Sequence, residues 1–100
     1  MASENSIASI TSRIALNIGR LTGSFWAIDS TAHADARFIA ESCLKALETS
    51  GCAVVASEYV EVAEKRLDGA VAFSDNIQRW AKECVRDTRA FIFAAETARR

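Results

Sequence analysis

Residues 23–38 read GSFWAIDSTAHADARF, and this stretch decides the fold because the chain on both sides of it has helical periodicity. Gly23 is typical of the residue just past a helix end, and residues 29–31, Asp-Ser-Thr, could cap a new helix. The apolar stripe nevertheless continues in phase from Ile28 to Ile39, whereas an inserted turn would normally reset the phase. We therefore favour a bent helix here, with a break into two helices as the alternative.

Two apolar stripes flank a single clear turn. In the first, which runs from Ile7 to Leu47, apolar residues recur at steps of three and four, the period of an α-helix. A second stripe of the same kind runs from Val55 to Ala95. Gly51 lies between them, and glycine commonly follows the last residue of a helix, so we predict that the chain turns there.

Two all-α architectures fit this pattern. In the first, a long helical hairpin of two long helices turns near Gly51 and pairs into a helical bundle. In the second, a compact four-helix bundle, the helices also break near residues 23–31 and 68–75, with Ser74 or Asp75 as a new cap. We favour the hairpin because the phase survives both interruptions. Each of its helices would meet only one neighbour, so its wide apolar faces would need a second copy, whereas the four-helix bundle needs none.

The composition narrows the class of protein. The chain has 100 residues, half of them hydrophobic and a quarter charged, with a net charge of -1 and no proline. This length fits a single all-helical domain over residues 1–100. The charge balance argues against a disordered tail and against nucleic-acid binding. No run approaches the roughly 20 apolar residues that span a membrane, so we expect no transmembrane segment.

The cysteines point to a reducing compartment and not to a metal site. Cys43, Cys52 and Cys84 are odd in number and form no C-x-x-C, and the N-terminus lacks the pattern of a signal peptide. We therefore expect reduced thiols and a cytoplasmic location. His33 and the cysteines could together supply four ligands, but no two have a chelating spacing. We predict no metal site and no cofactor.

No residue pattern indicates an enzyme. His33, the only histidine, invites comparison with histidine phosphotransfer domains, but it lacks their lysine three residues on and glycine four residues on. Asp35 would also repel an incoming phosphoryl group. The chain has no Glu-x-x-His motif for a di-iron bundle and no glycine-rich phosphate loop. We expect no catalytic residues.

Charged residues form two stripes in the second half of the chain. One stripe is acidic and the other basic, and both have helical steps of three and four: Glu58, Glu61, Glu64 and Asp68; Arg79, Lys82, Arg86 and Arg89. Asp75, Glu83 and Asp87 interleave with the basic stripe and offer partners to it. We expect both stripes to be exposed faces, and the basic one could touch an acidic surface.

Residues 58–83, EYVEVAEKRLDGAVAFSDNIQRWAKE, resemble phasins, small all-helical proteins that coat bacterial polyhydroxyalkanoate granules. The shared features are proline-poor, alanine-rich helices and a D-G-x-x-x-F segment, here Asp68, Gly69 and Phe73. The chain departs from them in its three cysteines and two tryptophans. The resemblance implies a granule-surface protein without catalytic residues that self-associates through the same helices.

We expect a non-catalytic interaction or assembly protein that forms a homo-oligomer, a dimer or higher, through its amphipathic helices. The residues predicted to make this interaction lie on the two stripes: Ile7, Ile10, Ile14, Ile18, Leu21, Phe25, Ile28, Ile39, Leu47, Leu67, Phe73, Ile77, Trp80 and Phe91. One alternative is a phasin-like coat on an apolar polyester granule or lipid surface, through the first helix. The other is a four-helix signalling module that uses His33.

Overall fold

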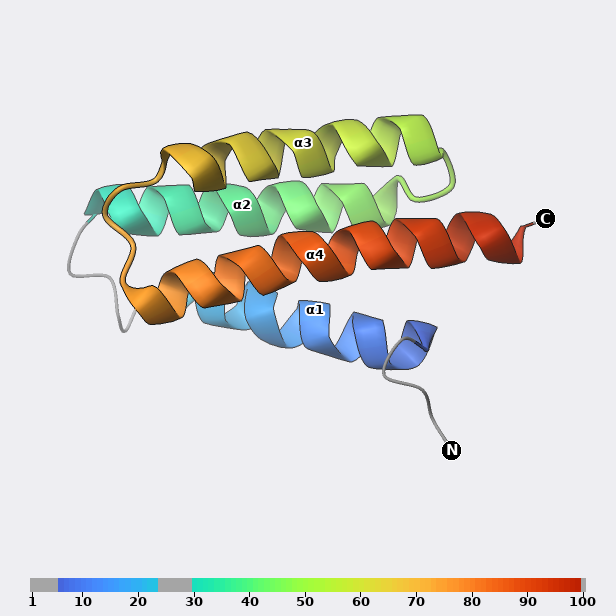
Figure 1. Cartoon of the computed structure of the whole chain (residues 1–100), viewed down its shortest axis with the longest axis horizontal. Helices are drawn as coiled ribbons and strands as arrows, with labels where there is room; N and C mark the ends of the chain where they lie inside the picture. The colour runs from blue at the N-terminus through green and yellow to red at the C-terminus, as the bar shows by residue number, and fades with distance from the viewer. Residues whose placement is uncertain (1–5, 24–29, 100) are drawn as a thin grey trace.

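The computed structural model describes residues 6–23 and 30–99, which form four α-helices and no strand. They are α1 (Ile7–Thr22), α2 (Ser30–Glu48), α3 (Ala53–Gly69) and α4 (Asp75–Ala98). Figure 1 shows that successive helices run in opposite directions, so the chain is an up-and-down bundle. The all-α prediction and the turn near Gly51 are confirmed.

The compact four-helix alternative is the observed arrangement, and the favoured long hairpin is not. α3 ends at Gly69, and α4 packs against both α3 and α1 instead of extending the line of α3. Ser74 is the cap of α4, because its Oγ accepts a hydrogen bond from the Ile77 N–H at 3.4 Å. The apolar phase survived the break because Phe73, in the linker, also packs against the core.

The first interruption also separates two helices. α1 ends at Thr22, and the N–H of Gly23 donates to the carbonyl of Gly19 at 3.1 Å. α2 begins at Ser30 and runs back antiparallel to α1, against which it packs (Figure 1). The predicted bend between them, with the predicted interaction residues Phe25 and Ile28, lies outside the described residues.

The bundle is flat, with extents of 45 × 31 × 17 Å. The central pair, α2 and α4, are in contact with each other, and each also contacts α1 and α3. Within the described ranges α1 and α3 do not touch, so they form the two outer edges. The outward sides of α3 and α4 are therefore neighbouring surfaces of one molecule.

Small side chains dominate the core. Alanine contributes many of the fully buried positions, alongside a few larger residues: Ala36, Ala40, Ala46, Ala56, Ala63 and Ala81, with Ile10, Ile14, Leu21, Ile39 and Val60. Interaxial distance depends on the side chains at the contact, so alanines allow α2, α3 and α4 to approach closely. This close packing buries much of both apolar stripes within one chain.

Candidate interaction face

Most residues predicted for self-association lie in the core of the single chain. Six are buried: Ile10, Ile14, Leu21, Ile39, Leu67 and Ile77. Five more pack against the core while partly exposed: Ile18, Leu47, Phe73, Trp80 and Phe91. Ile7 is 44% exposed at the start of α1. The contacts of these stripes are made largely within the chain, so a binding surface has to be sought elsewhere.

An acidic ridge follows the outward side of α3. We define it by Glu58, Glu61 and Asp68, which are all exposed and have no ion-pair partner among residues 6–23 and 30–99. Glu64, on the side of α3 nearest α4, accepts a hydrogen bond from Arg89, with Nη2 and Oε1 2.8 Å apart. This ion pair lies beside the acidic ridge, on its α4 side, and connects α3 to α4.

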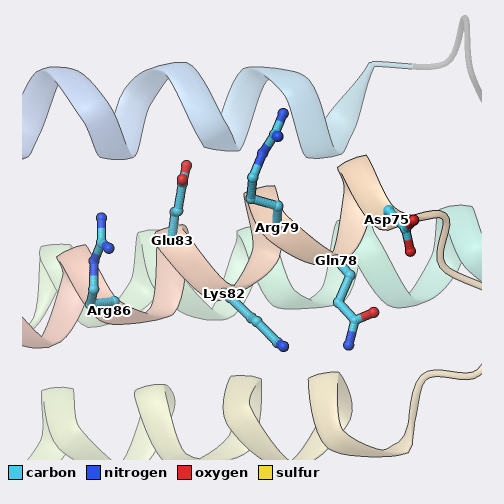
Figure 2. A pocket seen from close by; sticks show the side chains of 6 residues that line it. All are labelled: Asp75, Gln78, Arg79, Lys82, Glu83 and Arg86. Atoms are coloured by element: carbon cyan, nitrogen blue, oxygen red, sulfur yellow. The ribbon is translucent and has the colours of Figure 1, made fainter.

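A basic ridge follows the outward side of α4. We define it by Arg79, Lys82 and Arg86, which are all exposed. Figure 2 shows Lys82 pointing toward α3, while Arg79 and Arg86 point toward α1 with Glu83 between them. Arg86 is 3.5 Å from the carboxylate of its chain neighbour Asp87, whereas the described part of the chain holds no ion-pair partner for Arg79 or Lys82. The ridge borders a shallow hollow of about 550 Å³.

A groove between α3 and α4 lies beyond the basic ridge, toward the C-terminal end of α4. It encloses about 310 Å³ and is lined by Ser57 and Val60 of α3 and by Arg89, Ile92, Phe93 and Glu96 of α4. Phe93 is 73% exposed and is the largest side chain among the exposed hydrophobic residues of the described ranges. The two charged ridges, the groove and Phe93 together make up what we call the α3–α4 face.

A second hollow, between α2 and α3, already holds its own cation. The guanidinium of Arg66 lies 4.1 Å from the centre of the Phe38 ring, and its Nη1 is 3.0 Å from Oδ1 of Asp35. Val62 and Lys65 line the same hollow. Because Arg66 covers the aromatic face, this site offers less to a partner than Phe93 does.

The residues singled out for chemistry are dispersed. His33 is half-buried on α2, and Cys52 is exposed at the turn before α3. Cys43 and Cys84 are buried together between α2 and α4. The Cys84 thiol donates a hydrogen bond to the Cys43 sulfur, which lowers the pKa of Cys43 and raises that of Cys84, and burial raises the pKa of Cys84 further. Nowhere in residues 6–23 and 30–99 do three His, Cys, Asp or Glu side chains converge to hold a metal ion.

Comparison with known proteins finds no family model, no curated protein and no solved structure that matches this chain. Among the helices of the described ranges, none has both the length and the apolar character to cross a bilayer. Helical spacing predicted both charged ridges, but Phe93 was missed because the predicted apolar stripe passes through its neighbour Phe91. The available signal was an aromatic residue one turn beyond Arg89, on the charged side of the helix.

Proposed function

We propose that this chain is a non-catalytic helical interaction protein that binds a protein partner through its α3–α4 face. The observation that carries the proposal is the exposed ring of Phe93 at a groove, beside two charged ridges. An aromatic anchor surrounded by polar and charged residues is typical of protein–protein interfaces. Burying such a ring in a partner removes apolar surface from water, which favours association.

The charged ridges support the same proposal. Exposed cations on α4 and exposed carboxylates on α3 are largely unused inside the chain, although Glu64 and Arg89 show that the two helices can pair such groups. Charge of this kind steers encounter and fixes the register of a complex more than it adds affinity. We therefore assign the energy of binding mainly to Phe93 and the specificity to the ridges.

The two alternative functions use other parts of the molecule. A phasin-like coat would contact a granule or lipid surface through the first stripe, which lies on α1 and α2, but Ile10, Ile14 and Ile39 are buried. That contact would require the bundle to open. A signalling module would depend on His33, which is half-buried. Neither alternative draws on the exposed groups of the α3–α4 face.

Site-specific cross-linking in the cells that normally make the protein tests this proposal. A photoreactive p-benzoylphenylalanine at position 93 should form an adduct with a protein partner on irradiation. The same residue at position 44 is the matched control, because Leu44 is an exposed apolar residue on α2, outside the groove. Absence of an adduct at position 93, or equal adducts at both positions, would contradict the proposal.

A further inference from the structure

We infer that the partner which binds the α3–α4 face is a second copy of this chain, arranged as a two-fold dimer. This inference rests on the proposed function. It starts from the fact that one surface carries both an acidic and a basic ridge, on adjacent antiparallel helices (Figure 1). A two-fold axis that lies in the interface and runs along the groove, parallel to the helices, turns a second copy face to face with the first. Each α4 then lies opposite the α3 of the other copy, so the basic ridge meets the acidic ridge twice.

The positions of the ridges along the bundle fit this arrangement. Rotation about an axis parallel to the helices does not change the position of a residue along the length of the bundle. The symmetry therefore fixes the register, because the two copies cannot shift along the bundle relative to each other. The Glu64–Arg89 ion pair fixes the relative level of α3 and α4. From that pair, a rise of about 1.5 Å per residue places Asp68 of one copy at a level between Lys82 and Arg86 of the other. Lys82 already points toward α3, whereas the Arg86 side chain, which points toward α1 in Figure 2, turns toward Asp68 in the dimer. The same count places Glu61 within one helical turn of the other copy's Arg89.

The same axis also brings apolar groups together. The groove lies on the axis, and Phe93 keeps its own level, so the Phe93 rings of the two copies meet across the axis. Each ring then faces the groove of the other copy, which includes Val60 and Ile92. The charges set the direction of the axis, and the same arrangement buries a side chain that is 73% exposed in one chain. Ion pairs would surround this apolar centre, as in other protein interfaces.

Charge reversal on each ridge tests whether the two ridges meet. Variant A carries Lys82→Glu and Arg86→Glu, so acidic groups replace the cations opposite Asp68. Variant B carries Glu61→Lys and Asp68→Lys, so its α3 and α4 ridges are both basic. Either variant alone would bring like charges together twice in the dimer. In an equimolar mixture, a dimer of one A chain and one B chain pairs the acidic α4 of A with the basic α3 of B, and the basic α4 of B with the acidic α3 of A. Opposite charges then meet at both contacts.

Light scattering over a concentration series measures the outcome. The wild-type chain should have twice the mass of one chain, and raised salt should favour dissociation. Variants A and B should each dissociate with a Kd raised about tenfold or more, and their mixture should recover the dimer. Far-UV circular dichroism of A and B, unchanged from wild type, shows that the substitutions leave the fold intact.

Two further comparisons serve as matched controls. Arg79 lies at a level beyond the end of α3 in the other copy, where no carboxylate of the acidic ridge reaches it. Arg79→Glu should therefore weaken the dimer less than Arg86→Glu, although both variants change the net charge equally. Phe93→Ser should weaken the dimer, whereas Leu44→Ser should not, because Leu44 is an exposed apolar residue outside the groove.

Two results would overturn the inference. One is a wild-type chain that stays monomeric throughout the series, and the other is variants A and B that dimerise as well alone as when mixed. The cross-link at position 93 distinguishes this failure from failure of the proposed function. An adduct with the mass of two chains agrees with the dimer. An adduct of another mass keeps the interaction function but replaces the second copy with a different partner.

Discussion

Arg13 of α1 and Asp87 of α4 form a two-point ion pair across the bundle. Nε of Arg13 is 3.3 Å from Oδ2 of Asp87, and Nη2 is 3.4 Å from Oδ1. The Asp87 side chain is only 3% exposed, so its carboxylate depends on this guanidinium, with Arg86 as a more distant second cation. The pair ties the outer helix α1 to a central helix.

Arg13→Met should therefore destabilise the protein markedly. Removing one partner leaves a buried carboxylate without its main counter-charge. Because the Arg13 side chain is itself 36% exposed, we expect a loss of about 2–3 kcal/mol in the free energy of unfolding, below that of a fully buried pair. The matched control is Arg37→Met, which breaks an ion pair with Glu41 in which both side chains are about 60% exposed. That pair should contribute less than about 0.5 kcal/mol. Urea denaturation measures both values, and equal losses would contradict a special role for Asp87.

Ser74→Ala should weaken the start of α4. The Ser74 hydroxyl accepts a hydrogen bond from the backbone N–H of Ile77, and loss of such a cap costs about 1 kcal/mol. Ser12→Ala is the control, because Ser12 lies exposed inside α1, where alanine is the better helix former. Chemical denaturation should show a lower midpoint for the first variant and an unchanged or higher midpoint for the second. A Ser74→Ala chain as stable as wild type would show that the helix break does not depend on this cap.

The cap illustrates how far the sequence could determine the fold. Ser74 was predictable as a cap, and Gly51 as a turn, because both depend on local chemistry. The choice between two long helices and four short ones was not, because it depends on which surfaces meet. Phe73 kept the apolar phase intact across a linker by packing on the end of the core. Apolar periodicity indicates which residues are buried. It does not show whether successive buried residues belong to one helix or to two.

The candidate face was predictable only in part. Helical spacing alone identified both charged stripes and indicated exposed faces. It could not show that the partner of Asp87 lies 74 residues away, at Arg13, because that contact follows from the packing of α1 on α4. Phe93 was missed for a different reason, because helical spacing places it one turn beyond Arg89, on the exposed side, but the apolar stripe was followed through its neighbour Phe91.

Ile14→Ala distinguishes a core residue from an interface residue. Ile14 is fully buried within one chain, so its truncation should leave a cavity and cost about 2–4 kcal/mol. The loss should be the same at every protein concentration, because no second copy covers this side chain. Leu16→Ala is the control two residues on, where the side chain is 54% exposed and the change should stay within about 0.5 kcal/mol. A loss at position 14 that grows as the protein is concentrated would instead indicate an oligomer interface, because association stabilises the wild type more than the variant.

The three thiols should differ in reactivity because they differ in burial, and not because they differ in charge state. The hydrogen bond from Cys84 lowers the pKa of Cys43, which by itself favours the reactive thiolate. Cys43 is nevertheless completely buried, as is Cys84, so a reagent reaches either one only when the bundle opens. Cys52 is exposed at the turn and should react at once with Ellman's reagent.

Native protein should therefore show one fast thiol and two slow ones, and all three should react rapidly in denaturant. Cys52→Ser is the control, because it should abolish the fast phase and leave the two slow thiols unchanged. A destabilising change elsewhere, such as Ile14→Ala, should increase the reaction rates of both slow thiols together, because both become accessible when the contact between α2 and α4 opens. Fast reaction of Cys43 in the native chain would show that its lowered pKa outweighs its burial, and that the contact between α2 and α4 opens far more readily than this packing indicates.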